Sequence, residues 1–555
     1  MCSFHHGQLG YICQPMKLIN TLLLSCLFLT ITAQSLQRPK LVIGIVVDQM
    51  KYDYIYRYWD KLGDGGFKRL VKEGFECSNT RYNYAPTVTG PGHASIYTGT
   101  TPSVHGIISN DWYDRITKKN IYCAEDNSVK SVGCDSKTGA MSPKNLLANT
   151  IGDELMLATN FKSKVIGISL KDRGAILPAG HAANAAYWFD NKTGYWISST
   201  YYMPQLPEWV NQFNALKFPE EYNKMAWNTL LEISKYTEST DDNTIYENAF
   251  KGESAPIFPH DFGKLNSKDF ENIRRSPFGN TLTTDFAKAT ITSEKLGADE
   301  ITDLLCVSFS STDYIGHQFG PNAIETEDCY LRLDKDLEDL LNFLDQNLGK
   351  KNVLLFLTAD HGAVQNPQFL IDHKFNAGFF DPKEVERVAK DFLVNEYHDS
   401  LLFEAMGDQS IYLNHDEIEK KKLSLVTIRS QLAEVLMKIP GLADAYPAPV
   451  LNFEEAHNKT IHLLQMAYNS NRSGDVFYVL PPNYIESTNK KGTTHGAPYS
   501  YDTHVPLYFY GYNILHGSSK NQINITDIAP TISSILHVEF PNGSISNPID
   551  LPTTK

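Results

Sequence analysis

The sequence predicts an α/β fold, with a central and mostly parallel sheet flanked by helices and two sizeable insertions. The first observation behind this prediction is a set of apolar runs, rich in β-branched residues, that are typical of strands buried on both faces. Because ligands bind outside the carboxyl ends of parallel strands, we expect the polar residues that follow these runs to meet at one sheet edge. The runs are Leu41–Val47 before Asp48, 165–170 before Lys171, 304–309 before Asp313, and 353–357 before Asp360 and His361.

The second observation is a helix that links two of these strands. Leucines recur with helical spacing from Leu333 to Leu348, and Gly349 follows as a plausible helix stop. Strand, amphipathic helix and strand form a βαβ unit, whose strands are normally parallel. We also expect helices near 65–73, 145–160 and 426–437, a hairpin at 187–196 and a late strand at 505–510.

The first residues carry the features of a targeting segment. Met16-Lys17 precedes an apolar run that ends at Ile31, and small residues follow at Ala33 and Ser35. This basic, apolar, small order is typical of a secretory signal peptide. We therefore expect a leader at 1–33, with Met16 as a candidate true start. A single catalytic domain would follow at 34–555, with insertions near 174–290 and 374–490.

The leader predicts an exported protein, periplasmic or secreted, cleaved near Ala33. Cys26 follows Leu-Leu-Ser and leaves open a less favoured alternative, attachment to a membrane through a lipid on this cysteine. The leader's apolar run is too short for a comfortable membrane span, and no later segment is long and apolar enough. Export permits disulfides, and Cys123 and Cys134 form the expected pair because they lie close together in a polar loop. Cys306, inside an expected strand, is interpreted as a core residue.

The net charge of −14 argues against a nucleic-acid backbone as a partner. An anionic substrate would need local positive charge from metal ions and a few cationic side chains.

Acidic and imidazole side chains gather where the expected strands end. Asp313 and His317 are spaced to share one side of a helical turn, and aspartate and neutral histidine are standard zinc ligands. Asp360-His361 ends a buried strand, where an ionisable pair costs free energy unless something binds it. Asp48 repeats this pattern. Each residue alone also fits a hydrogen-bonded or capping role, but three coincidences at strand ends favour a metal site.

Thr89 is the candidate nucleophile. It lies in Thr89-Gly-Pro-Gly-His93, where an extended stretch turns into a short helix. The start of a helix presents free N–H groups and a positive dipole to an anion. A threonine hydroxyl is a poor nucleophile at neutral pH, and metal coordination removes that objection. The alternative is that Thr89 only caps the helix.

These patterns together resemble the alkaline phosphatase superfamily over the whole mature chain. The sequence is most similar to the phosphate-irrepressible bacterial alkaline phosphatases (PafA-type), and the motifs occur in that family's order. The motifs are Val46-Val47-Asp48, Thr89-Gly-Pro-Gly-His93, Ser109-Asn110-Asp111-Trp112, Leu170-Lys171-Asp172-Arg173, Ser311-Thr-Asp313-Tyr-Ile-Gly-His317, Thr358-Ala-Asp360-His361-Gly362 and Thr493-Thr-His495-Gly496.

The resemblance implies an alkaline-phosphatase-like fold and a phosphate monoester hydrolase that releases inorganic phosphate. It implies two Zn²⁺ ions and a covalent phosphothreonine intermediate at Thr89. The implied ligands are Asp313, His317 and His495 for one zinc, and Asp48, Asp360 and His361 for the other, with Thr89 also bound to the latter.

Asn110, Lys171 and Arg173 resemble the family's grip on phosphate. Arginine can donate two parallel hydrogen bonds to phosphate oxygens, and lysine supplies a compact charge. In the resemblance, this cationic pair accompanies dianionic monoesters, so the expected partners are small-molecule phosphate monoesters. For the oligomeric state, a monomer is favoured. The alternative is a nucleotide pyrophosphatase/phosphodiesterase with the same two metals. Those relatives resemble the metal site but lack the cationic pair, which therefore distinguishes the two classes.

Other readings are weaker. A sulfatase needs Cys or Ser in a Cys/Ser-x-Pro-x-Arg motif, and Thr89 fills that place here. A non-catalytic phosphate- or metal-binding protein is disfavoured because no site motif is missing. We expect His93 and His181 to be structural, and Asp502 and His504 to belong to a hydrogen-bonded loop. The aromatic residues at 187–196 are expected to pack in the core, with a pocket-lining role as the minority interpretation.

Overall fold

A computed structural model describes residues 1–3, 37–265, 267–453 and 455–553. It divides into two compact units, Met1–Arg38 and Pro39–Lys555, and the following description concerns the second. The predictions on Met16, Cys26 and Ala33 lie outside the described residues. Within the described ranges, no helix is both long enough and apolar enough to cross a membrane.

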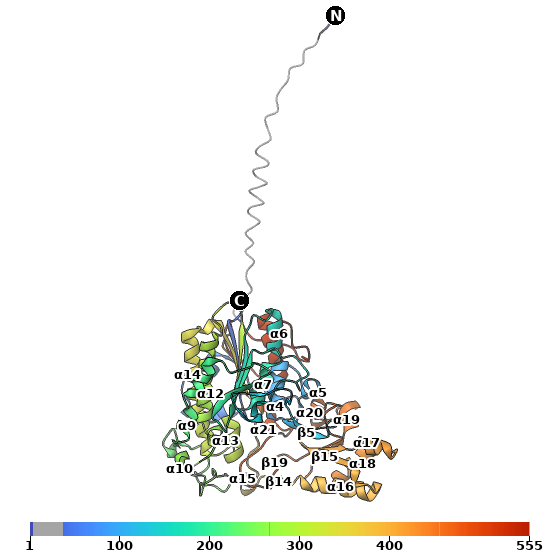
Figure 1. Ribbon diagram of the computed structural model, residues 1–555. Helices are drawn as coiled ribbons and strands as arrows, with labels where there is room; N and C mark the ends of the chain where they lie inside the picture. Colours follow the sequence, from blue (N-terminus) through green and yellow to red (C-terminus); the bar gives the residue numbers. More distant parts are fainter. Residues whose placement is uncertain (4–36, 266, 454, 554–555) are drawn as a thin grey trace. The chain divides into compact units, whose positions relative to one another are not determined.

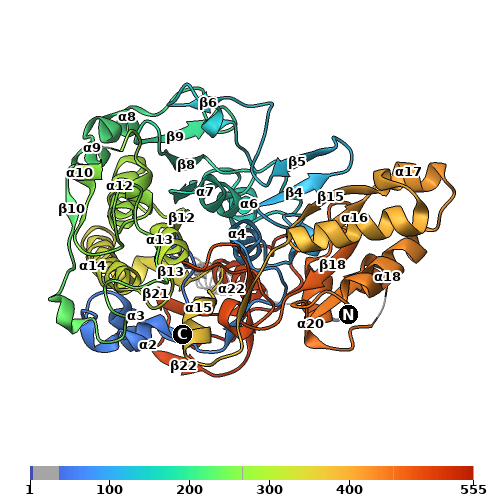
Figure 2. The same ribbon diagram turned by 90° about the horizontal axis from the view of Figure 1, so that it is seen from below.

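A ten-stranded sheet forms the centre of the fold, in the order β22-β2-β21-β13-β1-β12-β7-β8-β9-β6 (Figure 2). The five strands from β13 to β8 are parallel, which confirms the predicted mostly parallel sheet. Every residue of β13, β1, β12 and β7 is buried, as the apolar runs predict. These strands are β1 (Leu41–Val47), β7 (Val165–Ser169), β8 (Ala185–Asp190), β12 (Asp303–Phe309) and β13 (Val353–Thr358).

Antiparallel pairs flank the five parallel strands on both sides, and the edge strand β22 pairs parallel with β2. The predicted late strand is β21, which pairs antiparallel with β13, and the predicted hairpin is β8–β9. The aromatic side chains of this hairpin pack into the core, where Trp196 stacks on Phe286 with ring centroids 4.2 Å apart. The remaining strands are β2 (Phe75–Cys77), β6 (Ser131–Val132), β9 (Tyr195–Ser199), β21 (Leu507–Gly511) and β22 (Gly517–Ser519).

Helices cover both faces of the sheet. In Figure 1, α12 and α14 lie to one side of the strands, and α4, α6 and α7 lie to the other. The predicted βαβ unit is β12–α14–β13, but β1 lies between its two strands. The helix thus crosses over the first strand of the domain. These helices are α3 (Phe67–Glu73), α4 (Thr89–Thr98), α6 (Ile151–Ala158), α7 (Asp172–Ala179), α12 (Phe278–Glu294) and α14 (Ile324–Asn347).

A smaller sheet, in the order β15-β16-β18-β17, lies within the range expected for the second insertion. It shares a separate hydrophobic cluster with α16 and α18, and α18 is the helix predicted near 426–437. In the range expected for the first insertion, β8 and β9 extend the central sheet. The elements are α16 (Lys383–Tyr397), β15 (Phe403–Gly407), β16 (Ser410–Leu413), α18 (Leu425–Leu436), β17 (Asp444–Pro447) and β18 (Val476–Val479).

The expected disulfide between Cys123 and Cys134 is wrong, because both are free thiols. Cys123 is buried in a hydrophobic cluster beside α7. The sulfur of Cys134 instead lies 3.4 Å from the Ser136 hydroxyl and 3.6 Å from that of Thr138. Their proximity in sequence therefore did not bring the two side chains together. Cys306 is buried in β12, as expected for a core residue.

Candidate two-metal and phosphate site

The carboxyl ends of three neighbouring strands bring together the residues predicted to bind metal. Asp48 follows β1 directly, and its N–H donates to the Phe309 carbonyl at the end of β12 (3.0 Å). Asp360 and His361 follow β13. Two groups result, and within each the ligand atoms lie within 4.8 Å of one another. The first group is Asp48, Asp360 and His361, and the second group is Asp313, His317 and His495.

The first group is completely buried, with no exposed side-chain surface. Its Asp48 Oδ1, Asp360 Oδ2 and His361 Nε2 atoms have no hydrogen-bond partner among the residues that the structure describes. The His361 Nε2 atom lies 3.6 Å from each of the two carboxylates. Buried polar atoms without partners cost free energy, and a cation between them removes that cost. The donor set of two carboxylates and one imidazole fits zinc.

The second group combines a helix and a loop. α13 (Ser311–Phe319) begins just after β12 and carries both Asp313 and His317, whose Oδ1 and Nε2 atoms are 3.1 Å apart. His495 comes from the loop that precedes α21 (Ser500–Thr503), and its Nε2 lies 3.7 Å from the same Asp313 oxygen. The rings of His361 and His495 stack with centroids 3.5 Å apart, so the two groups adjoin.

Backbone carbonyls orient all three imidazoles in the same way. The Nδ1–H groups of His317, His361 and His495 donate to the carbonyls of Thr493 (2.9 Å), Gly362 (2.9 Å) and Thr87 (2.8 Å). Each Nε2 is left to face its carboxylates, as is common for metal-bound histidines. Burial lowers the pKa of His361 to about 4, which keeps this ring neutral, the form that binds a metal.

Thr89 is the first residue of α4 and is 1% exposed. The N–H of the next residue, Gly90, donates to Asn110 Oδ1 (2.8 Å), so the asparagine amide N–H₂ group is the end that remains for a ligand. Lys171 Nζ lies 3.4 Å from Thr89 Oγ1 and 2.6 Å from one oxygen each of Asp48 and Asp313. One ammonium therefore contacts both metal-ligand groups and the candidate nucleophile.

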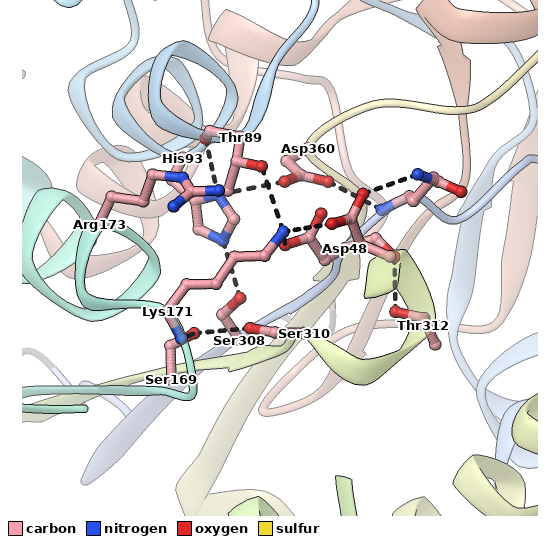
Figure 3. Close-up of polar contacts among 12 residues, drawn as sticks. Asp48, Thr89, His93, Ser169, Lys171, Arg173, Ser308, Ser310, Thr312 and Asp360 are labelled. Carbon is pink, nitrogen blue, oxygen red and sulfur yellow. Dashed lines mark hydrogen bonds and ion pairs between the residues drawn. The ribbon is translucent and has the colours of Figure 1, made fainter. Parts of the chain in front are cut away.

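Figure 3 shows Lys171, between β7 and α7, and Arg173, in the first turn of α7, extending towards Thr89. The Lys171 N–H donates to Ser169 Oγ (3.1 Å), which fixes the turn between strand and helix. Arg173 donates to the Tyr122 hydroxyl through Nη1 (3.0 Å), while its Nε has no hydrogen-bond partner. The structure thus brings the candidate phosphate-binding side chains to the nucleophile.

His93 lies on the helix that carries Thr89, and its Nδ1 lies 3.4 Å from Asp360 Oδ2. Its Nδ1–H donates to the Thr89 carbonyl (2.9 Å), and its Nε2 accepts from the Ser308 hydroxyl (2.9 Å). Burial lowers its pKa to about 4. His181 likewise contacts Asp153 Oδ2 (3.2 Å) and the Leu146 carbonyl (3.0 Å), away from both ligand groups.

The sequence analysis missed Gln49. Its side chain donates to Asp313 Oδ1 (2.7 Å) and its N–H donates to Asp360 Oδ1 (3.1 Å), so it touches both groups. The backbone adopts φ +62° here, which glutamine rarely does. A Cβ atom on Gly316 would lie 1.9 Å from Gln49 Oε1, so only glycine leaves room. Position next to Asp48 was the sole available signal.

Two cavities adjoin the site. One of about 330 Å³ is lined by Asn110, His317 and His495 together with parts of the smaller sheet. The other, of about 300 Å³, is lined by Lys171, Arg173 and Arg274. Tyr314 lies between two of these cations, with its ring centroid 5.0 Å from Lys171 Nζ and 4.4 Å from Arg274 Cζ.

Known proteins resemble this chain over nearly its whole length. A family model described as type I phosphodiesterase/nucleotide pyrophosphatase matches residues 42–504. A protein named calcium-transporting ATPase from Myroides odoratus is 48% identical over 94% of this chain and 96% of its own. The alkaline phosphatase PhoV of Synechococcus elongatus is 48% identical over 93% of each chain. The alkaline phosphatase PafA of Elizabethkingia meningoseptica is 45% identical over 92% of this chain and 94% of its own. A crystal structure of PafA, 44% identical, superposes with a TM-score of 0.90 over 93% of this chain and 99% of that one.

Proposed function

The chain belongs to the type I phosphodiesterase/nucleotide pyrophosphatase family, and we propose that it hydrolyses phosphate monoesters with two zinc ions and Thr89 as nucleophile. The protein is an alkaline phosphatase, as its likeness to PhoV and PafA indicates. The observation that carries the finer proposal is the pair of adjoining ligand groups near Thr89, one of them completely buried. Export to the periplasm or the medium is part of the proposal and rests on the leader sequence.

The residues divide into ligands and phosphate-binding groups. Asp313, His317 and His495 would hold one zinc, and Asp48, Asp360 and His361 the other, with Thr89 as a further ligand of the latter. When bound, the two ions favour ionisation of the hydroxyl and of a water molecule and neutralise the departing oxygen. The buried atoms without partners in the first group support this assignment.

Chemistry at Thr89 takes two displacements. In the first, Thr89 Oγ gives up its proton to solvent and attacks phosphorus, the bond to the alcohol oxygen breaks, and that oxygen takes a proton from water. In the second, a water molecule attacks the phosphothreonine and releases inorganic phosphate, and Thr89 regains its proton. Lys171, Arg173 and the Asn110 N–H₂ group hold the nonbridging oxygens in both steps.

The cationic pair favours monoesters over diesters. A monoester presents all its nonbridging oxygens to Lys171 and Arg173, whereas a second substituent blocks one of them in a diester. Phosphodiesterase activity remains the second candidate, because the description of the matching family names it.

The test is a hydrolysis panel on purified protein of measured metal content. The panel holds an aryl phosphate, the corresponding methyl aryl diester, and ATP, which the name of the Myroides relative suggests. We expect the aryl phosphate to have the highest kcat/KM, chelation to abolish turnover, and zinc to restore it. A higher kcat/KM on the diester, or full activity in metal-free protein, would contradict the proposal.

A further inference from the structure

The cavity of about 330 Å³ adjoins only one of the two ligand groups. His317 and His495 line it, together with Asn110, and no member of the first ligand group does. In the proposed reaction, Thr89 is held with the first group and attacks phosphorus in line, so the alcohol departs on the opposite side, towards the second group. The cavity therefore lies where the alcohol portion of a bound monoester would extend.

The tip of a hairpin in the smaller sheet forms one wall of this cavity. β15 and β16 are joined by Asp408 and Gln409, which have φ +45° and +56° and both line the cavity. A two-residue turn with positive φ at both positions matches the twist of the strands. The Tyr478 N–H donates to the Gln409 carbonyl (3.0 Å) and ties the tip to β18.

A second acidic side chain comes from β19 (Tyr484–Glu486), which pairs with β14 (Gly378–Phe380). Glu486 lines the cavity, and its Oε1 accepts a hydrogen bond from the Tyr478 hydroxyl (2.6 Å). Tyr478 thus contacts both acidic segments, the hairpin tip through its N–H and Glu486 through its hydroxyl. This shared partner makes the wall a built feature of the fold.

The wall gives the cavity a negative character. No lysine or arginine is found among the described residues that line it. The cavity beside the phosphate-binding pair has the opposite character, since Lys171, Arg173 and Arg274 line it. A third carboxyl group, Asp502, also lines the acidic cavity. Burial raises the pKa of all three carboxyl groups, that of Asp408 to about 6 and that of Asp502 to about 8, so the negative charge of the cavity increases from neutral to alkaline pH.

We infer that this cavity is the subsite for the alcohol portion of the substrate, and that Asp408 and Glu486 favour alcohols carrying an ammonium group over alcohols carrying a carboxylate or a second phosphate. The inference rests on the proposed monoesterase function. Leu480 and Tyr484, which also line the cavity, supply apolar surface for the carbon skeleton of such an alcohol.

Three aryl phosphates that differ only in one ring substituent test the inference. The substituents are trimethylammonium, an uncharged group of similar size, and carboxylate, at the same ring position. The readout is the ratio of kcat/KM for the cationic substrate to kcat/KM for the anionic one. Differences in leaving-group reactivity cancel when this ratio is compared between wild type and variants.

Asp408→Asn and Glu486→Gln remove the charge and keep the shape. Asparagine adopts positive φ readily, and a glutamine oxygen still accepts from Tyr478, so both variants preserve the local fold. We expect each change to lower the ratio about tenfold, the effect of one unit charge a few ångströms away in a partly solvated site. The wild-type ratio should also fall as salt is added.

Glu434→Gln is the matched control, because Glu434 is an exposed residue of α18 that does not line the cavity. It should keep the wild-type ratio. The subsite assignment is overturned if the Asp408 and Glu486 variants keep the wild-type ratio of kcat/KM. It is also overturned if the control variant lowers this ratio as much as they do. Failure to hydrolyse even the uncharged substrate would instead overturn the proposed function, so the two failures are distinguishable.

Discussion

Gln49 connects the two adjoining ligand groups, whose residues lie far apart in the sequence. It follows Asp48 directly and hydrogen-bonds to one carboxylate of each group. Hydrogen bonds to metal-binding carboxylates fix their orientation and tune metal affinity. In the proposed site, Gln49 would therefore position the Asp313 and Asp360 carboxylates.

Gln49→Ala should weaken zinc binding about 10- to 100-fold, because Asp313 loses a fixed hydrogen bond. Competition with a fluorescent chelator measures this affinity directly, independently of activity. Gln431→Ala, on α18, is the matched control and should bind zinc as wild type does. Unchanged affinity in the Gln49 variant would show that the carboxylates are oriented without it.

Lys171 and Arg173 are the residues to which we attribute the proposed preference for monoesters. Lys171→Ala and Arg173→Ala should each lower kcat/KM for an aryl phosphate by roughly 10²- to 10³-fold, as loss of a preorganised donor to a developing anion does. The loss for the methyl aryl diester should be smaller, since one of its oxygens is blocked. Equal losses on both substrates would mean that the pair does not discriminate between them.

At the scale of elements, the site depends on how α4 meets the end of β13. A Cβ atom on Gly92 would lie 2.5 Å from the Asp360 carbonyl oxygen, which is backbone and cannot turn aside. The glycine therefore allows the helix that carries Thr89 to pack directly on a strand end that carries metal ligands. The hydrogen bond from the Gly90 N–H to Asn110 Oδ1 lies in the same turn of α4 as Gly92.

Gly92→Ala should push α4 away from β13 and lower kcat at least about 100-fold, the usual effect of misplacing a reacting group by an ångström. Gly63→Ala is the control, because its Cβ would meet only side-chain oxygens, of Asp334 at 3.2 Å and of Glu338 at 3.8 Å. Both variants are to be compared by melting temperature and by kcat. A Gly92 variant that keeps full kcat would refute the close-packing argument.

The strands and the site residues at their ends could be predicted, because runs buried on both faces leave a plain apolar signal. The start of α14 could not. Its first turns are acidic, yet Glu325, Glu327 and Asp328 are buried. Partners distant in sequence make this possible, since Lys61 pairs with Glu327 and the Trp227 indole donates to Asp328 (2.7 Å). A sequence pattern cannot show partners that only the fold brings near.

The acidic wall of the cavity could not be predicted from the sequence either. Asp408 lies at the tip of the β15–β16 hairpin and Glu486 on β19, in two different sheets, and only the fold brings both to the cavity that His317 and His495 also line. Most of the candidate ligands were easier to place, because they follow strands whose position in a parallel sheet is set by their burial. His495, from the loop before α21, came only from the resemblance. The contacts of Gln49, whose backbone has φ +62°, had no signal in the sequence beyond its position next to Asp48.

At the scale of the whole molecule, one buried ion cluster links α14 to the long loop before α12. His260 is buried between Glu253 and Glu325, with ring nitrogens 3.0 and 3.1 Å from their oxygens. Although burial alone would lower it, these carboxylates raise the pKa of His260 from 6.5 to about 9. The protonated imidazole is therefore favoured in the folded protein.

The cluster should make stability fall at alkaline pH. A raised pKa in the folded state contributes fully below the unfolded value near 6.5, and the contribution is lost as pH rises through about 9. The loss is on the order of 3 kcal/mol. Urea unfolding across this window should show the decline in wild type and a flatter profile in His260→Gln, with exposed His373→Gln as control. Identical profiles in all three proteins would refute this account.

Thr89 lies at the centre of the whole arrangement, beside both ligand groups and the phosphate-binding pair. The direct measurement is mass spectrometry of zinc-loaded enzyme, quenched in acid during turnover of an aryl phosphate and digested to peptides. The account predicts one phosphoryl group on Thr89, present in wild type and missing in Thr89→Val. A phosphoryl group on another residue, or rapid turnover by the Thr89 variant, would contradict it.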